Sequence, residues 1–173
     1  MRLIRINVRP GIGAQARPMK LTRYTDYALR IMTHLARSPD RLVAIHALAQ
    51  ACDAPENHVM KVTPALVRGG FVKSTRGRGG GLRLGRPADE ILLGDIVRLT
   101  EGGFDLDDCT GCALASDCKL RQALSLAAEA FLTVLNQFSL TDMLDENTQS
   151  IPLKVEKLPS INLSSISAPC RPV

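Results

Sequence analysis

The sequence is poor in aromatic residues and in long apolar runs. It has no Trp, and aromatic residues make up 3% of its 173 residues, so its core must be built from aliphatic side chains. The most apolar stretch, residues 120–135, is interrupted by Arg121 and Glu129 and is too short to predict a membrane span. Residues 1–18 lack the apolar segment of a secretory signal. We therefore expect no membrane association and a cytoplasmic location.

Cysteine is also scarce, but it is unevenly placed. Five Cys are too few for a disulfide scaffold of this length, so the thiols are expected to be free, ligating or catalytic. Three of them follow one another closely as Cys109-x2-Cys112-x5-Cys118. Such spacing lets several thiolates converge on one centre, which selects zinc or an iron–sulfur cluster.

Three thiolates are one ligand short of four, which leaves several interpretations of this loop open. An Asp, Glu or His, or a residue of another chain, would complete a metal site. A site incompletely closed by thiolates suits a sensor better than a structural zinc site. The alternatives are a zinc site without a sensing role, a thiol switch formed by Cys109 and Cys112, and cysteines that serve only in packing.

The charge is divided between the two halves of the chain. Residues 1–86 contain 16 Lys and Arg and 4 Asp and Glu, whereas residues 87–173 contain 6 and 13. A strongly basic segment next to an acidic one predicts that the first half binds a polyanion, and nucleic acid is favoured over simple surface solvation.

Apolar spacing in the basic half predicts three helices, over residues 22–37, 43–51 and 55–68. Two short helices joined by a tight turn predict a helix-turn-helix, whose second helix enters the DNA major groove. The polar residues that we expect on the outer face of that helix, as candidates for base and phosphate contacts, are Asn57, His58, Lys61 and Arg68.

Two short strands are predicted directly after these helices, within FVKSTRGRGGGLRLG, residues 71–85. The loop RGRGGG between them lacks the Gly-Lys-Ser/Thr pattern and the following helix of a phosphate-binding loop. A hairpin with a basic, glycine-rich tip after a helix-turn-helix is typical of a winged helix. Glycine permits close approach to a duplex, where Arg76 and Arg78 would contact phosphates or the minor groove.

Two further helices are predicted, over residues 92–101 and, after the cysteine loop, over residues 119–137. The second has a broad apolar stripe, more than a small winged helix needs to cover, so we expect a partner chain and a homodimer. The fold class is therefore mainly α, with a winged helix-turn-helix, a β-hairpin wing and a long C-terminal dimerisation helix.

Four segments follow from this pattern. Residues 1–18 are expected to be a disordered or mis-assigned N-terminal extension, because Met19 begins a plausible natural start. Residues 19–86 form the predicted winged helix-turn-helix domain. Residues 87–147 hold the predicted cluster-binding loop and dimerisation helix, and residues 148–173 are expected to be a disordered tail rich in Pro and Ser.

Together, MKLTRYTDYALR, the helix-turn-helix, RGRGGGLRLGRPADEI, the three-cysteine loop and SLTDML resemble the dimeric winged-helix iron–sulfur repressors, over about residues 19–147. This family includes the NsrR, IscR and RirA regulators, and the nitric-oxide-sensing NsrR branch is the most similar. The resemblance implies bacterial transcription control by a homodimer on a palindromic double-stranded operator. It also implies that Cys109, Cys112, Cys118 and, from the other subunit, Asp26 hold a 2Fe–2S or 4Fe–4S cluster.

The resemblance implies a repressor, not an enzyme, whose DNA affinity depends on the cluster and responds to nitric oxide. The alternatives are an iron or cluster-status sensor of the RirA or IscR type and, from another class, a thiol oxidoreductase that uses Cys109 and Cys112. No His follows Cys118 closely, which disfavours the IscR type. Pro64 departs from the expected pattern, because proline within a helix predicts that the second helix of the helix-turn-helix bends or restarts there.

Overall fold

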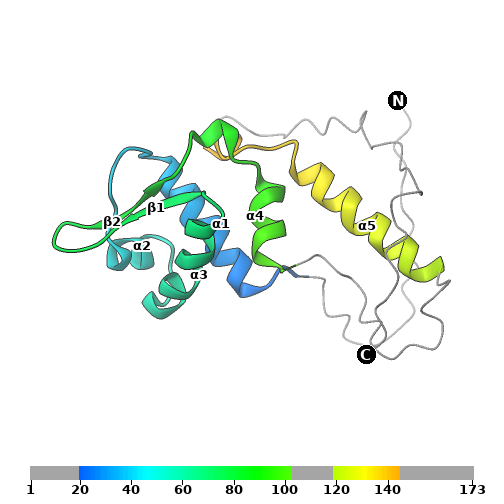
Figure 1. Ribbon diagram of the computed structural model, residues 1–173, viewed down its shortest axis with the longest axis horizontal. Helices are drawn as coiled ribbons and strands as arrows, with labels where there is room; N and C mark the ends of the chain where they lie inside the picture. The colour runs from blue at the N-terminus through cyan, green and yellow to red at the C-terminus, as the bar shows by residue number, and fades with distance from the viewer. Residues whose placement is uncertain (1–19, 103–118, 145–173) are drawn as a thin grey trace.

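The computed structural model describes residues 20–102 and 119–144. The predictions for residues 1–19, for the three-cysteine loop and for the tail from residue 145 fall outside these residues and stay predictions. The described chain is mainly helical with one antiparallel hairpin, which confirms the predicted fold class (Figure 1). Its elements are α1 (Arg23–Ala36), α2 (Ile45–Ala51), α3 (Glu56–Arg68), β1 (Val72–Thr75), β2 (Gly81–Leu84), η1 (Ala88–Glu90), α4 (Leu93–Thr100), α5 (Lys119–Leu135) and η2 (Thr141–Met143).

Helix α1 is the central element and packs against α3 and α4. Its N-cap is Thr22, whose hydroxyl accepts a hydrogen bond from the Thr25 N–H at 3.2 Å, as a cap residue should. The predicted apolar face is confirmed, since its aliphatic members are buried: Ala28, Ile31, Met32 and Leu35. The helix therefore contributes one side to the common core, and its polar side stays exposed.

Helix α2 begins two residues later than the sequence predicts. Val43 does not start the helix but forms an antiparallel bridge with Leu82 of β2. The two residues exchange backbone hydrogen bonds of 2.9 and 2.8 Å. This tertiary pairing competes with helix formation, and it attaches the chain before α2 to the hairpin.

Helix α3 runs without interruption through Pro64, so the predicted restart at that residue is wrong. Proline removes only one backbone donor, and the buried residues on both sides of it keep the helix in place. These residues include Val62, Ala65 and Leu66. The Tyr24 hydroxyl of α1 also donates to the Lys61 carbonyl of α3 at 3.4 Å, one turn before the proline.

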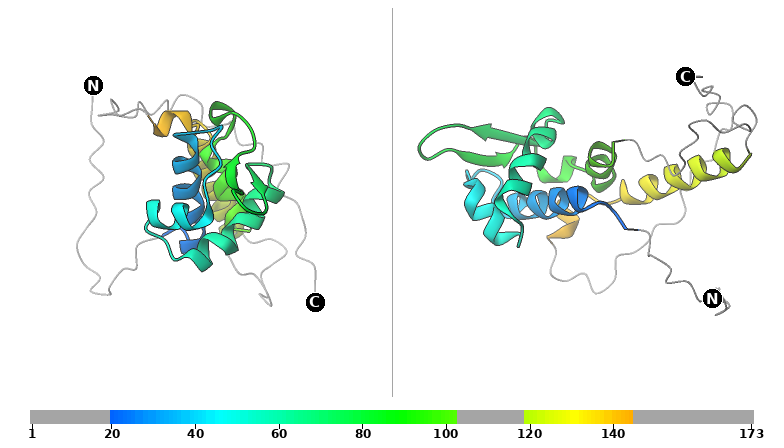
Figure 2. Two further views of the ribbon diagram at one scale, coloured as in Figure 1. Left: turned by 90° about the vertical axis from the view of Figure 1, so that its left-hand side faces the viewer. Right: turned by 90° about the horizontal axis from the view of Figure 1, so that it is seen from below.

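Strands β1 and β2 pair in the register Val72↔Leu84 to Thr75↔Gly81. The buried residues of the pair, which include Val72, Leu82 and Leu84, attach the hairpin to the core. A side chain at position 81 would be 2.5 Å from the Val43 carbonyl oxygen, so the close approach to Val43 requires glycine. The loop between the strands projects from one end of the molecule, and α5 extends at the other end (Figures 1 and 2).

Helix α4 connects the core to α5. Leu92 bridges Ser139, and the Leu140 N–H donates to the Ile91 carbonyl at 2.9 Å, which brings the chain after α5 back to the core. Where α4 meets α5, Gly94 lies directly against the Asn136 side chain, with no room for a methyl group. The α4–α5 contact is therefore close.

Helix α5 is only partly covered in the described chain. Of its apolar residues, Ala128 and Leu132 are buried, whereas Leu120 is 66% exposed. An apolar helix face that its own domain leaves uncovered is consistent with the predicted dimerisation helix. Among the described residues, none of the helices combines the length and the apolar character that crossing a bilayer requires.

Candidate nucleic-acid interface

Helices α2 and α3 form the expected helix-turn-helix. The turn between them is tight, since the Cys52 N–H donates to the Leu48 carbonyl at 2.9 Å and the Ala54 N–H to the Ala49 carbonyl at 3.0 Å. Asp53 has a φ of 48°, which lets the chain reverse direction. The turn therefore fixes the position at which α3 begins.

Three of the predicted DNA-contacting residues of α3 lie on its exposed face. Asn57, Lys61 and Arg68 recur at intervals of four and seven residues, so they lie along one ridge of the helix. The opposite face is buried against the core through Val59 and Leu66. The exposed ridge is therefore free to enter a groove of DNA with an amide and two cationic groups.

The fourth predicted residue, His58, lies at the edge of this face. Its ring packs on Tyr27 of α1, with 5.2 Å between the ring centroids and 56° between the ring planes. It is partly buried, unlike Asn57 and Lys61. The structure therefore gives His58 a packing contact between α1 and α3, which sequence reasoning did not predict.

Two residues of the exposed face were not identified from the sequence. Glu56 and Met60 lie four residues apart on a second ridge, and Met60 is 50% exposed. A sequence signal was available, since both residues fall outside the apolar spacing of the helix. Glu56 adds a carboxylate and Met60 adds an apolar side chain, next to the ridge of Asn57, Lys61 and Arg68.

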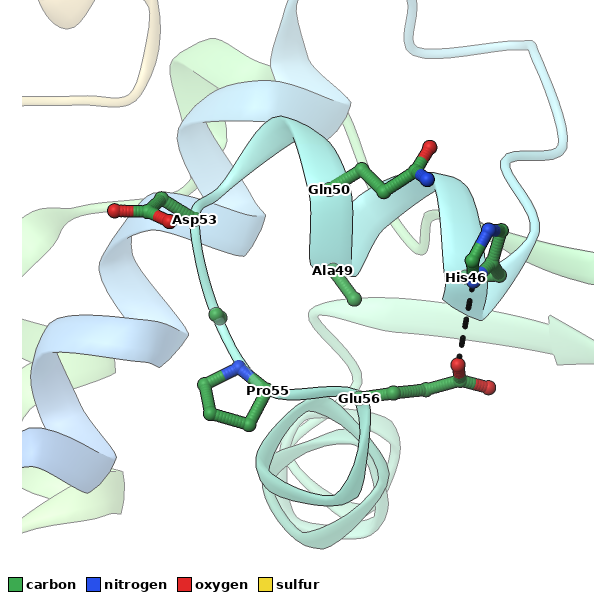
Figure 3. Close-up of a pocket in the computed structure, with 7 residues that line it drawn as sticks. His46, Ala49, Gln50, Asp53, Pro55 and Glu56 are labelled. Atoms are coloured by element: carbon green, nitrogen blue, oxygen red, sulfur yellow. Dashed lines mark hydrogen bonds and ion pairs between the residues drawn. The ribbon is translucent and has the colours of Figure 1, made fainter.

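The Glu56 carboxylate pairs with His46 of α2, with 3.3 Å between Oε2 and the imidazole Nδ1 (Figure 3). An open hollow of about 580 Å³ lies between α2 and α3 at this pair, which we call the α2–α3 hollow; its polar lining includes Gln50 and Asp53. A second hollow of about 400 Å³, the wing hollow, lies between the same pair and Arg76 of the hairpin loop.

The wing, which consists of β1, β2 and the loop Arg76–Gly80, presents the other predicted cations. Arg76 and Arg78 are exposed in the loop, as predicted. Gly77 and Gly79 have φ values of 96° and 79°, a conformation that favours glycine. The Gly80 N–H donates to the Gly77 carbonyl at 2.9 Å, so the loop closes as a tight turn.

The strands of the wing add two further cations. Lys73 and Arg83 are directly opposite each other in the antiparallel register. Like charges in such positions destabilise a sheet, and a bound polyanion would remove that repulsion. These residues complete a basic surface that extends from the loop along the hairpin.

Asp26, the predicted fourth ligand of the cluster, lies in the first turn of α1. Its carboxylate pairs with the Arg30 guanidinium at 2.9 Å, and about half of each side chain is exposed. The hydrogen bond from Arg30 to Asp26 and the negative charge of Asp26 raise the pKa of Arg30 above its ordinary value. Arg30 also donates through Nη1 to the Cys52 carbonyl at 3.4 Å, so it links α1 to the helix-turn-helix turn.

The start of α1 is attached to the end of α4 just before the cysteine loop. The Glu101 carboxylate accepts from the Thr22 N–H at 2.9 Å and from the Thr22 hydroxyl at 3.1 Å. Next to it, the buried Thr25 hydroxyl donates to the Thr100 hydroxyl at 2.8 Å. This network fixes Asp26 relative to the point where the chain enters the loop.

Cys109, Cys112 and Cys118 lie outside the described residues. Cys52 is the one cysteine within residues 20–102 and 119–144, and burial raises the pKa of its thiol, the opposite of what a thiolate ligand requires. The same part of the chain contains no group of three or more His, Cys, Asp or Glu that could hold a metal ion. The metal-binding prediction thus remains with the loop and Asp26.

Comparison with known proteins identifies the family. Residues 21–146 match the Rrf2 family, described as iron-dependent transcriptional regulators. A transcriptional regulator from Listeria innocua is 31% identical, over 76% of this chain and 90% of its own, with a TM-score of 0.61. T. potens IscR is 26% identical, over 78% of this chain and 93% of its own, with a TM-score of 0.62. CymR, the global cysteine regulator of B. subtilis, is 28% identical, over 72% of this chain and 95% of its own, with a TM-score of 0.58. The chain belongs to the Rrf2 family of transcriptional regulators.

Proposed function

We propose that this regulator is a repressor that binds a double-stranded operator through α3 and the wing. The observation that carries the proposal is the exposed ridge of Asn57, Lys61 and Arg68 beside a glycine-rich loop with Arg76 and Arg78. The ridge would contact base edges in the major groove, and the wing arginines would contact phosphates or the minor groove. Such a protein acts in the bacterial cytoplasm.

The proposed active form is a homodimer. The uncovered apolar residues of α5, represented by Leu120, support a second copy of the chain as its partner. Two-fold symmetry places two α3 helices on two half-sites, about one helical turn apart. The operator is therefore expected to be palindromic.

The proposed cofactor is an iron–sulfur cluster, of either the 2Fe–2S or the 4Fe–4S type. Cys109, Cys112 and Cys118 of one subunit and Asp26 of the other would hold it. The chemistry of the donors fits, because three thiolates suit iron and the carboxylate of Asp26 is half-exposed in the described structure. The family description as iron-dependent regulators also supports this assignment. When bound, the cluster would supply iron that reacts with nitric oxide, the proposed signal.

The residues of the chain would connect the site to the DNA-binding surface. Asp26 pairs with Arg30, which in turn contacts the Cys52 carbonyl in the turn before α3. Binding of Asp26 to the cluster would replace its pair with Arg30. The Thr22–Glu101 hydrogen bonds would hold α1 and α4 together when Asp26 changes partner. Loss of the Asp26 ligand would thus alter the position of the turn and lower the population that binds DNA.

Anaerobic purification tests the cofactor directly. We expect an absorption band from iron–sulfur charge transfer, with iron and acid-labile sulfide at stoichiometric levels. Operator binding is then titrated with nitric oxide and, separately, with an iron chelator. Release of the operator by nitric oxide, without an iron chelator, supports the nitric-oxide sensor. Cys112→Ala should abolish that response. Iron-free protein that binds the operator fully would disprove the cluster assignment.

Three alternatives are distinguished by their own outcomes. Release of the operator by chelation alone would assign the protein as an iron or cluster-status sensor, like the RirA and IscR types. A third candidate is control of DNA binding by the thiols of Cys109 and Cys112, and the likeness to Staphylococcus aureus CymR, whose structure is described as an oxidized form, supports it. Operator binding that changes with a dithiol reductant in metal-free protein would favour it. Turnover of a disulfide substrate would instead indicate a thiol oxidoreductase.

A further inference from the structure

The proposed DNA-binding surface contains one group whose charge opposes binding to DNA. Glu56 is the only acid in α3, and it lies in the first turn, on the exposed side of the helix. Its side chain is 49% exposed, so the presence of Glu at this position is not explained by a role in the buried core. A carboxylate at this position would be repelled by phosphates if it had no specific partner in the complex.

Glu56 lies next to the elements proposed to contact DNA. Its Oε2 atom pairs with His46, and both residues border the α2–α3 hollow and the wing hollow. Figure 3 shows the Glu56 side chain extending from the start of α3 toward His46 of α2. The pair therefore lies between α2 and the two elements proposed to contact the duplex, α3 and the wing.

The chemistry of the major groove allows a carboxylate to select one base. Cytosine presents an N4 amino donor there, whereas guanine presents two acceptors and thymine presents an acceptor and a methyl group. Adenine has an N6 donor, but the N7 acceptor beside it repels a carboxylate. Since an ionised Glu can only accept hydrogen bonds, cytosine is its best partner.

We propose that Glu56 is a specificity-determining residue that accepts a hydrogen bond from the N4 amino group of a cytosine in each half-site. This inference rests on the proposed function as a DNA-binding repressor. His46 is a positioning residue in this arrangement, because its contact with Oε2 leaves Oε1 for the base. The residue that weakens general affinity for DNA thereby improves discrimination between sequences.

The test is selection of random duplexes by the full chain, prepared anaerobically, with sequencing of the bound DNA. The wild type should enrich a palindrome with a conserved cytosine in each half-site. Changing that cytosine to another base should lower the affinity of the wild type roughly 5- to 100-fold. Glu56→Ala should lose the preference, so the same change of base should alter its affinity little. Glu56→Gln should prefer adenine at the same position, because Gln can bond both N6 and N7.

The controls separate this role from others. Glu90→Gln makes the same change of charge in η1 and should leave every base preference unchanged. His46→Ala should weaken the cytosine preference without moving it to another position. A purely helix-stabilising Glu56 would alter thermal unfolding but not base preference. The inference is overturned if Glu56→Ala and Glu56→Gln select the wild-type palindrome at every position. Failure of the wild type to enrich any sequence would instead overturn the proposed function.

Discussion

The Asp26 carboxylate accepts two bonds from the Arg30 guanidinium, at 2.9 Å from Nη2 to Oδ2 and at 3.1 Å from Nε to Oδ1. Both carboxylate oxygens are therefore engaged in the described structure. A metal ion that takes Asp26 as a ligand must compete with Arg30 for the same oxygens. The proposed ligand is thus held by a group that would regain it when the metal bond is lost.

Replacement of Arg30 should make the proposed sensor less responsive. In Arg30→Gln, Asp26 loses the cation that it pairs with in the described structure, so the metal-bound arrangement is favoured. We expect the nitric oxide concentration for half-release of the operator to rise, roughly up to fivefold, as for an exposed ion pair. The measurement is operator binding by anaerobic holoprotein during nitric oxide titration.

Arg37→Gln provides the matched control, because it removes an exposed Arg at the other end of α1. It should respond to nitric oxide as the wild type does. Thermal unfolding of the metal-free proteins should be nearly the same for all three chains. An unchanged or increased sensitivity of Arg30→Gln would show that Arg30 does not compete for Asp26.

The buried hydroxyls of Thr25 and Thr100 should contribute measurably to stability. Thr25→Val keeps the shape of the side chain but removes the 2.8 Å hydrogen bond and leaves Thr100 without that donor. The expected loss in the free energy of unfolding is about 1–2 kcal/mol. Urea unfolding of the metal-free protein measures it.

The double variant provides the sharper comparison. Thr25→Val/Thr100→Val should cost less than the two single changes together, since either single change already removes the one hydrogen bond that the two hydroxyls share. Thr33→Val is the control on the same helix, because it removes only the bond to the Leu29 carbonyl at 2.9 Å. Strict additivity of the two single changes would mean that the pair has no joint role.

Pro64 should reduce the stability of α3. Pro64→Ala restores the backbone donor that the Met60 carbonyl lacks, a gain of up to about 3 kcal/mol in a helix interior. Proline also restricts the unfolded chain, which offsets about 1 kcal/mol of that gain. The variant should therefore be more stable by roughly 1–2 kcal/mol in urea unfolding. Pro87→Ala, at the cap before η1, should show no such gain, and a destabilised Pro64→Ala would contradict this account.

Local signals in the sequence were sufficient for the order and type of the described elements. The spacing of apolar residues such as Ala28, Ile31 and Leu35 predicted α1, because burial of one helix face is a local property. The pattern of residues 71–85 predicted β1 and β2 in the same way. Proximity of the hairpin to the helices then predicted a winged helix.

Contacts between elements were beyond local reasoning. Val43 has a helical sequence context, but its pairing with Leu82 depends on how the hairpin folds back. The Glu56–His46 pair and the packing of His58 on Tyr27 likewise join residues on different helices. Single-sequence patterns contain no information on such pairs, so they predicted which residues are polar and exposed but not which residues they contact.

The wing arginines should contribute affinity without contributing to sequence preference. Arg76 and Arg78 are exposed beside glycines, so they can contact phosphates but have little fixed geometry with which to select a base. Each change to Ala should weaken binding to all duplexes alike. It should also reduce the slope of log affinity against log salt by about 1, as one phosphate contact is lost. Arg98→Ala removes a cation that pairs with Glu129, away from the wing, and should leave the slope unchanged. A loss of affinity confined to one sequence would show that an arginine contacts a base, and an unchanged slope would show that the wing does not touch the DNA backbone.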